Sequence, residues 1–328
     1  MKKNRLSFLI AEVLLAAIAG VFIHKIFAED TPDKKVAVIL QESGSSKWDT
    51  VINGMKQSAK NNGLHLIICN TDDIENAKEE SELIADQLAN DVDGFVICPA
   101  PGADTEDEIN RVCGDKTYVF IGEDVYSTDM DAQRTEGSSD RIVVGPDNYN
   151  IGVMLAQQIA ADDKDGLKGK RIGIITGRDK TESADSRLAG LMDTFDTYEC
   201  EVSWVYYYSP LHYTCKVVDA RPEVDYLVIA DTSALEEVAA NAENGLYKGA
   251  RIYGVGSSIR AISLVDSGNV TGLVIPDGYK TGYDSINEIG KKLSNPLYSM
   301  ESVKEDIMAI HREDIFTDEV ERFMYSYE

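Results

Sequence analysis

The stretch KVAVILQESGSSKWDTVINGMKQSAKNNGLHLIICNTD, residues 35–72, contains the unit from which the whole fold can be inferred. It opens with an apolar run at residues 36–40 and closes with another at 64–69. Between the two runs lies a segment with one apolar helical face, on which Val51 and Met55 are four positions apart. A short continuous apolar run suits a strand that is covered on both faces. The stretch therefore predicts a strand, a helix and a second strand.

The same alternation of apolar runs and helix-like segments continues along the chain in two sets. A polar break at residues 128–140 interrupts it. Alternating buried strands and helices form parallel sheets with right-handed crossovers. The sequence therefore predicts an α/β protein with two doubly wound, parallel-sheet (Rossmann-like) lobes. The runs of the first set are residues 36–40, 64–69, 94–98, 118–121 and 142–144, and those of the second set are 171–175, 202–208, 226–230, 251–255 and 272–276.

The net charge of the chain is strongly negative. Its 328 residues include 32 Lys and Arg against 57 Asp and Glu, a formal net charge of −25. The first 28 residues hold four of the basic residues and one of the acids, so the remainder carries −28. Such a surface keeps a protein soluble and repels nucleic acid and anionic lipid headgroups. We therefore expect no nucleic-acid partner.

The five cysteines form no pattern of metal ligands. Their number is odd, and neither a CxxC pair nor a Cys/His spacing typical of zinc occurs, so we expect no bound metal. Cys69 and Cys98 end apolar runs and are predicted to be buried thiols. Cys200 and Cys215 are either paired or free, and the sequence leaves both possibilities open.

Residues 1–30 are predicted to be a signal peptide or a membrane anchor. A basic start with Lys2, Lys3 and Arg5 precedes a mostly apolar stretch at residues 6–27, which is the pattern of an export signal. A stretch of about 20 residues is long enough to span a bilayer, and the positive flank favours a cytoplasmic N-terminus. We therefore expect the body of the protein to be extracytoplasmic, in the cell envelope, either anchored or secreted.

The sequence shows no catalytic pattern. Only four histidines occur, and no G-x-S-x-G, H-E-x-x-H or phosphate-binding loop is present. Gly254 and Gly256 follow an apolar run, but Ile259 takes the place of the third glycine of a dinucleotide-binding turn. We predict that the chain is not an enzyme and has no cofactor.

Several segments share their order and spacing with a known family. They are the opening stretch, DVDGFVICPA at 91–100, VVGPDNYNIGVMLAQQIA at 143–160, RIGIITGRDKTESADSRLAGL at 171–191 and RIYGVGSSIRAISLVDSGNVTGLVIP at 251–276. With these segments the chain resembles type I periplasmic binding proteins, the sugar-binding components of ABC transporters, whose fold is shared with lac-repressor-like effector domains. The resemblance covers about residues 34–312.

The resemblance implies two lobes that close on a ligand about a hinge. The family's chain crosses between the lobes three times, and here the crossings would fall near Asn148, near Pro276 and at residues 306–311. The implied division is an N-terminal lobe of residues 34–147 plus 277–305, a C-terminal lobe of residues 148–276 plus 306–312, and a tail of residues 313–328.

Trp48 and Arg187 are the first two candidate ligand contacts. Trp48 follows the first strand, where the family places ring-stacking aromatics, and an indole face suits the apolar face of a sugar ring. Its alternative role is to cap the next helix inside the lobe. Arg187 matches the family's ligand-binding arginine, and its guanidinium can donate two hydrogen bonds to hydroxyls or to a carboxylate. Its alternative is a surface ion pair with Asp185 or Glu182.

Four further candidates follow predicted strands. Glu123 stands where the family often has an aspartate that accepts from sugar hydroxyls, and its alternative is a solvated loop charge. Gln41 ends the first strand and can both donate and accept. Tyr208 is either a cleft aromatic or a core residue of its strand. Asp231 either lines the cleft or caps the helix that begins near Thr232.

The resemblance implies an extracytoplasmic binding protein for a small polar ligand, a sugar or a similar solute, which it delivers to an ABC transporter permease. Cys98 and Ala230 stand where sugar binders often have asparagine, so the resemblance is stronger for the fold than for the sugar. The alternative function is a membrane-tethered ligand sensor that signals through a partner chain.

Overall fold

The computed structural model describes residues 15, 34–128, 141–209, 213–241 and 246–325. Lys34–Glu328 forms one compact unit, separate from Met1–Asp33. The predicted signal or anchor, apart from residue 15, and nearly all of the predicted polar break at residues 128–140 lie outside the described residues. Within the described ranges, no helix has the length and apolar character needed to cross a bilayer.

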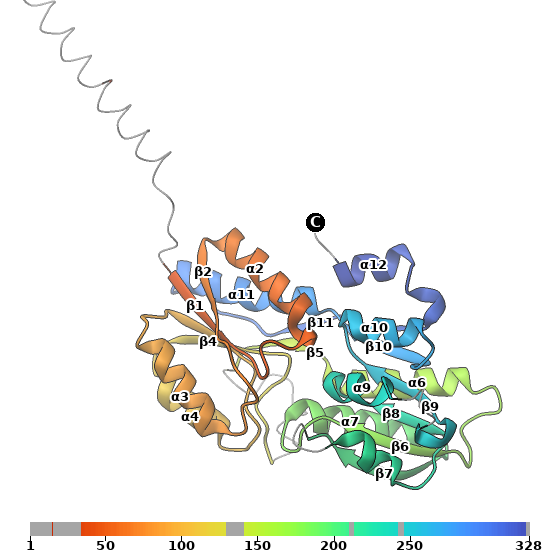
Figure 1. The fold of residues 1–328 in the computed structure, drawn as a ribbon. Coiled ribbons are helices and arrows are strands. Elements are labelled where there is room, and N and C mark those ends of the chain that lie inside the picture. Colours follow the sequence, from red (N-terminus) through yellow and green to blue (C-terminus); the bar gives the residue numbers. More distant parts are fainter. Residues whose placement is uncertain (1–14, 16–33, 129–140, 210–212, 242–245, 326–328) are drawn as a thin grey trace, which may run out of the picture. The chain divides into compact units, whose positions relative to one another are not determined.

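The first lobe contains a six-stranded parallel sheet with the strand order β11-β5-β4-β3-β1-β2 (Figure 1). Each of the five apolar runs of the first set forms one of its strands. The sixth strand, β11, comes from the far end of the chain. The bounds are β1 Lys34–Ile39, β2 Leu64–Ile68, β3 Gly94–Ile97, β4 Thr117–Ile121, β5 Val143–Pro146 and β11 Val303–Glu305.

The second lobe repeats this architecture with the strand order β12-β10-β9-β8-β6-β7. Five strands are parallel and come from the second set of runs, whereas β12 pairs antiparallel with β10. The prediction of two doubly wound α/β lobes is confirmed, with this antiparallel edge as an exception to the expected parallel pairing. The bounds are β6 Arg171–Thr176, β7 Glu201–Tyr207, β8 Tyr226–Ile229, β9 Arg251–Val255, β10 Gly272–Pro276 and β12 Ile307–Ile310.

Helices cover both faces of each sheet (Figure 1). In β1, Val36 packs in the core beneath α2 and α11, whereas Ala37 packs on the other face with α3 and α4. Successive side chains of a strand point to opposite faces, which is why these strands are apolar throughout. The helices are α2 Asp49–Asn62, α3 Ala77–Leu88, α4 Thr105–Cys113 and α11 Gly278–Ser294 in the first lobe, and α6 Asn148–Asp162, α7 Glu182–Asp196, α8 Thr214–Asp219, α9 Thr232–Ala239, α10 Ile259–Asp266 and α12 Asp318–Tyr325 in the second, with 3-10 turns η1 Ser46–Trp48, η3 Leu246–Gly249 and η4 Arg312–Asp314.

Each lobe contains a close crossing of two helices at paired glycines. A Cβ on Gly282 of α11 would lie 1.9 Å from the Val51 carbonyl oxygen of α2, and a Cβ on Gly152 of α6 would lie 2.1 Å from the Arg187 carbonyl oxygen of α7. Gly54 and Gly190 make the reciprocal approaches from α2 and α7. The missing side chains let the backbones touch, and in the second lobe this contact fixes the turn of α7 that carries Arg187.

The chain passes between the lobes at three places. The first two passages lead directly into α6 and α11, whose N-caps Asp147 and Asp277 accept hydrogen bonds from Asn150 N and Lys280 N at 3.0 and 2.9 Å. The third is the turn between β11 and β12 at Asp306, whose carbonyl oxygen accepts from Asp277 N at 3.0 Å. Two of the passages are therefore joined by a backbone hydrogen bond.

The end of the described chain packs on the second lobe. Ile315, Val320 and Met324 are buried in the same core as Ile310 of β12. Apolar burial therefore anchors η4 and α12 to this lobe. The five cysteines are free, so of the two possibilities for Cys200 and Cys215 the structure shows unpaired thiols.

Glu80 of α3 is a fully buried acid. Its Oε1 accepts from Ala100 N at 3.0 Å, and its Oε2 has no hydrogen-bond partner among the described residues. Burial raises the pKa of Glu80 from its ordinary value of 4.5 to about 8, because the charged form is poorly solvated. The folded protein therefore keeps this proton over a pH range in which the unfolded chain has lost it.

We expect the free energy of unfolding to decrease as the pH rises from about 4.5 to about 8, and Glu80→Gln to remove this decrease. Stability falls with pH wherever the folded state binds more protons than the unfolded state. Glutamine keeps the acceptor for Ala100 N but cannot ionise, so the variant should be more stable than the wild type at pH 8, by on the order of 3 kcal/mol. Urea titrations of both proteins at pH 5 and pH 8 measure the difference. The raised pKa of Glu80 would be contradicted if the two proteins differed in unfolding free energy by the same amount at pH 5 and at pH 8.

Candidate functional site

Loops at the carboxyl ends of the strands of both lobes line one cavity of about 160 Å³. In doubly wound sheets ligands bind at this edge. All six side chains predicted as ligand contacts line it, namely Gln41, Trp48, Glu123, Arg187, Tyr208 and Asp231. The first three belong to the first lobe and the others to the second. The fold therefore brings together, between the lobes, residues that are up to 190 positions apart in sequence.

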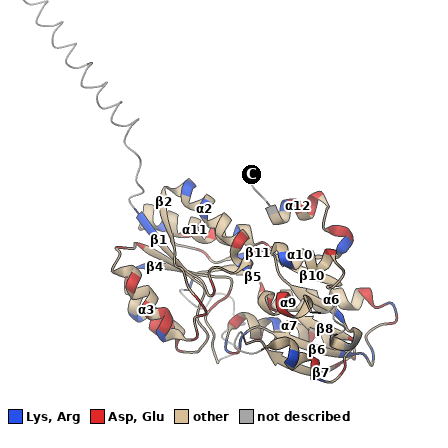
Figure 2. Ribbon diagram, viewed as in Figure 1, with Lys and Arg blue, Asp and Glu red and all other residues tan. Residues whose placement is uncertain are grey.

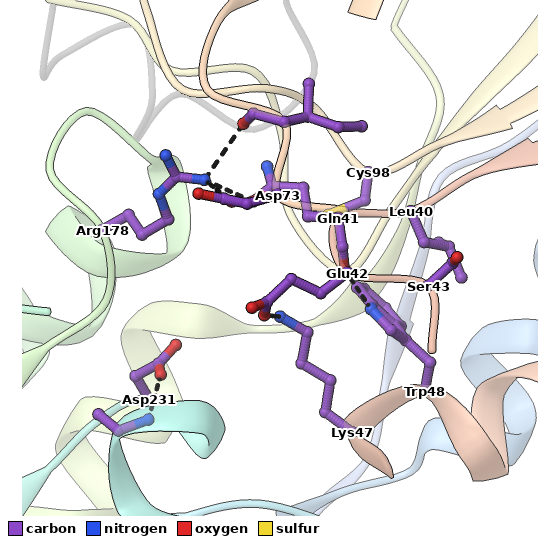
Figure 3. Close-up of polar contacts among 12 residues, drawn as sticks. Leu40, Gln41, Glu42, Ser43, Lys47, Trp48, Asp73, Cys98, Arg178 and Asp231 are labelled. Carbon is purple, nitrogen blue, oxygen red and sulfur yellow. Dashed lines mark hydrogen bonds and ion pairs between the residues drawn. The ribbon is translucent and has the colours of Figure 1, made fainter. Parts of the chain in front are cut away.

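Trp48 ends η1, directly after the loop that follows β1 (Figure 3). Its Nε1 donates to the Gln41 carbonyl oxygen at 2.8 Å, which fixes the plane of the indole. The Lys47 Nζ lies 5.6 Å from the centroid of the ring and pairs with Glu42 at 3.2 Å. Trp48 also packs against the first-lobe core. It therefore supports the lobe and lines the cavity, so its two predicted roles are compatible.

Gln41 is held by protein groups at both ends of its amide. Its Nε2 donates to the Pro99 carbonyl oxygen at 2.8 Å, and its Oε1 accepts from Arg178 at 3.4 Å. Figure 3 shows Arg178 of the second lobe extending towards Asp73 and Gln41 of the first. Gln41 thus contributes to the wall of the cavity with its amide already engaged.

Arg187 projects from the second turn of α7 and is held by two hydrogen bonds. Its Nε donates to Asn148 Oδ1 at 3.0 Å, and its Nη1 donates to the Ala230 carbonyl oxygen at 2.9 Å. Burial lowers the pKa of Arg187 from its ordinary value, and the charges of Asp231 and Glu123 oppose this shift. The predicted alternative, a surface pair with Asp185 or Glu182, does not describe a guanidinium held in this way. The second amino group, Nη2, has no hydrogen-bond partner among the described residues and is the donor left for a ligand.

Glu123 follows β4 and forms a contact between the lobes. Its Oε2 accepts from Ser183 N, in the first turn of α7, at 2.9 Å, and its Oε1 lies 3.9 Å from the Cys98 thiol. Burial raises the pKa of Glu123, whereas the hydrogen bonds from Ser183 and the charge of Arg187 lower it. A carboxylate at a helix N-terminus is stabilised by the helix dipole. Both oxygens thus have a donor within the protein, Ser183 N for one and the Cys98 thiol for the other.

Asp231 and Tyr208 complete the second-lobe side. Asp231 is the N-cap of α9 and accepts from Ala234 N at 2.8 Å, so the capping alternative is correct, and the same residue also lines the cavity. Tyr208 follows β7, and its backbone N–H donates to the carbonyl oxygen of Thr176 at 3.1 Å. Burial, followed by the charge of Asp231, raises the pKa of the Tyr208 hydroxyl, which therefore stays a neutral donor and acceptor.

Charged residues that were not among the six candidates also line the cavity. They are Glu42, Lys47, Asp73 and Arg178. Arg178 directly follows Gly177 at the end of β6, so the rule that ligands bind beyond strand ends points to it. Nothing in the sequence indicates its partner, because Asp73 lies 105 positions earlier, in the segment before α3.

The chain has two doubly wound lobes, three connections between them and a cavity of ligand size that both lobes line. These features define a two-lobed α/β binding protein. A family model described as the periplasmic binding protein domain matches residues 36–295, and the chain belongs to this family. The family is one of binding proteins and not of enzymes.

Solved structures agree with this fold. The chain is similar to a carbohydrate transporter solute binding protein from Agrobacterium radiobacter, solved in complex with D-arabinose, with 18% identity, a TM-score of 0.75, and coverage of 89% of this chain and 98% of that one. It is also similar to a glucose-galactose binding protein from Geobacillus stearothermophilus, with 18% identity, a TM-score of 0.72, and coverage of 87% and 99%. A third similar chain belongs to the XylFII–LytSN complex, with 16% identity, a TM-score of 0.70, and coverage of 86% and 98%. No curated protein matches the sequence.

Proposed function

We propose that this protein is extracytoplasmic, binds a single monosaccharide between its lobes and delivers it to an ABC importer. The observation that carries the proposal is one cavity lined by an aromatic ring of the first lobe, Trp48, and by Arg187 of the second lobe, whose Nη2 is left to donate to a ligand. A sugar ring has an apolar C–H face and a rim of hydroxyls, which these two groups complement.

The size of the cavity supports a ligand of one ring. A cavity of about 150 Å³ in another protein holds one benzene molecule, and the cavity here is about 160 Å³. The acceptors Glu123 and Asp231 and the hydroxyl of Tyr208 add partners for hydroxyl groups. Similar folds that bind D-arabinose or glucose and galactose are consistent with such a ligand.

The negative charge of the protein supports a small neutral ligand rather than a polyanion. Figure 2 shows acidic residues on helices of both lobes, including α3 and α9, in agreement with the net charge of −25. A small neutral solute is compatible with such a surface, whereas a polyanion is not. The N-terminal segment would hold the protein at the membrane, near a permease.

A second candidate function is ligand sensing through a partner chain. The similarity to the XylFII–LytSN complex favours it, because a protein of this fold occurs there in a complex. Both functions need the same sugar-binding cleft, so the binding experiment comes first.

We expect a saturable change in tryptophan fluorescence when the full-length chain is titrated with the correct sugar from a panel that includes D-arabinose, D-glucose and D-galactose. The change should come from Trp48, since Trp204 is buried in the second-lobe core and donates to the Pro222 carbonyl oxygen at 3.1 Å. Trp48→Phe should abolish the change while calorimetry still detects binding within roughly tenfold of the wild-type affinity, because a phenyl ring still stacks. Absence of binding to any monosaccharide in both assays would refute the proposal.

A further inference from the structure

The loop from β6 into α7 contacts the first lobe at three points. We call residues 177–183, the loop together with the first two residues of α7, the closing loop. Arg178 reaches Asp73, the Lys180 carbonyl oxygen accepts from Gly102 N at 3.0 Å, and Ser183 N donates to Glu123 at 2.9 Å. All three contacts join groups of different lobes and are made by the protein itself, so they belong to the closed arrangement whatever the cleft holds.

Arg178 makes the strongest of these contacts. Its Nη1 forms an ion pair with the Asp73 carboxylate and also donates to the Ile74 carbonyl oxygen at 3.1 Å and to Gln41 Oε1 at 3.4 Å (Figure 3). The side chains of Arg178 and Asp73 are only 21% and 23% exposed, so solvent screens this pair less than a surface pair. Opening the lobes would separate two partly buried opposite charges.

The closing loop is also held in one conformation. Lys180 has a φ of 62°, a left-handed conformation that a residue with a side chain keeps only when its surroundings impose it. The Thr181 hydroxyl donates to the Arg178 carbonyl oxygen at 2.9 Å and caps α7. Arg178 is therefore presented to the first lobe by a loop that is already shaped for the contact.

We propose that the closing loop is a latch in which Arg178, acting through Asp73, stabilises the closed lobes independently of the ligand. The closed form is then populated before the sugar arrives, and the apparent affinity rises with that population. The latch also slows release of the sugar, because the lobes must separate for it to leave. The expected effect on the affinity for the sugar and on its release rests on the proposed function, whereas the stabilisation of the closed lobes does not.

Amide hydrogen exchange of the full-length chain without sugar tests the latch directly. The amides of Gly102 and Ser183 are bonded across the lobes, so they exchange when the lobes open. We expect Arg178→Gln to accelerate their exchange about tenfold. The amide of Gly122, which bonds to the Val144 carbonyl oxygen within the first lobe at 2.9 Å, should be unaffected and shows that the variant is folded.

Arg171→Gln is the matched control. Arg171 lies at the other end of the same strand and is 3.9 Å from Asp225, so this substitution removes the same charge far from the cleft. It should leave the exchange of all three amides at the wild-type rate. Asp73→Asn should reproduce the acceleration seen for Arg178→Gln, and the double variant should exchange no faster than either single variant.

With the bound sugar, Arg178→Gln and Asp73→Asn should each weaken binding about tenfold through faster dissociation, and their effects should not add. Wild-type exchange rates at Gly102 and Ser183 in both variants would overturn the latch, and so would additive losses of affinity. If no sugar binds the wild type, the proposed function fails, but the exchange experiment still decides whether the latch exists.

Discussion

Arg187→Ala is expected to lower the affinity for the bound sugar by roughly 100-fold. A hydrogen bond from a charged donor contributes about 1.5 to 3 kcal/mol, so loss of the one from Nη2 to the ligand accounts for most of the effect. The substitution also leaves Asn148 Oδ1 and the Ala230 carbonyl oxygen without the donor that they have in the wild type. Arg187→Lys should recover only part of the loss, because an ammonium group cannot reproduce the planar set of donors that bonds Asn148 and Ala230 and leaves Nη2 for the ligand.

Calorimetric titration of Arg187→Ala beside Arg111→Ala measures this effect. Arg111 lies on α4 with 64% of its side chain exposed and pairs with Glu108 of the same helix, so its removal controls for the loss of a positive charge. Arg111→Ala should bind as the wild type does. Wild-type affinity in a folded Arg187→Ala protein would show that the arginine does not contact the ligand.

Gly282→Ala is expected to destabilise the protein by about 3 kcal/mol or more. The added Cβ would lie 1.9 Å from the Val51 carbonyl oxygen and 3.1 Å from Met55 N, and backbone atoms cannot move away without separating α11 from α2. Overpacking of this kind usually costs about 1 to 3 kcal/mol and sometimes more. The intrinsic preference of alanine over glycine in a helix, about 1 kcal/mol, is too small to offset it.

Thermal unfolding followed by circular dichroism compares Gly282→Ala with Gly44→Ala. A Cβ on Gly44 would meet no atom within 4 Å, and this residue is exposed, so its substitution should be nearly neutral. We expect the melting temperature of Gly282→Ala to fall by roughly 6 °C or more, since each kcal/mol corresponds to about 2 to 4 °C in a domain of 150 to 250 residues. Equal melting temperatures for the two variants would mean that the helix crossing is looser than described.

The fold could largely be predicted because the strands are buried on both faces. Each of the ten apolar runs became a strand, and the predicted helical face with Val51 and Met55 packs in the first-lobe core. The sequence gives only a weak signal for strands that do not form through burial of apolar side chains. β11 has only three residues, and its Glu305 is a buried acid, so no apolar run marks it. The antiparallel pairing of β12 follows from the tight turn at Asp306, which periodicity does not reveal.

The site could be predicted in its position but not in its contacts. Ligands of doubly wound sheets bind beyond the carboxyl ends of the strands, so we chose residues that follow predicted strands, and all six line one cavity. The hydrogen bonds from Arg178 to Gln41 and from Ser183 to Glu123 depend on how two separate lobes meet. The pairing of Arg178 with Asp73 could not be predicted for the same reason, because a pairing between lobes leaves no local pattern in the sequence.

A crystal structure of the full-length protein with its tightest-binding monosaccharide tests the central proposal most directly. We expect one sugar ring in the cavity, with its apolar face against the indole of Trp48 and a hydroxyl pair within hydrogen-bonding distance of Arg187. A sugar bound elsewhere on the molecule, or a ring that touches only one of the two lobes, would contradict the account.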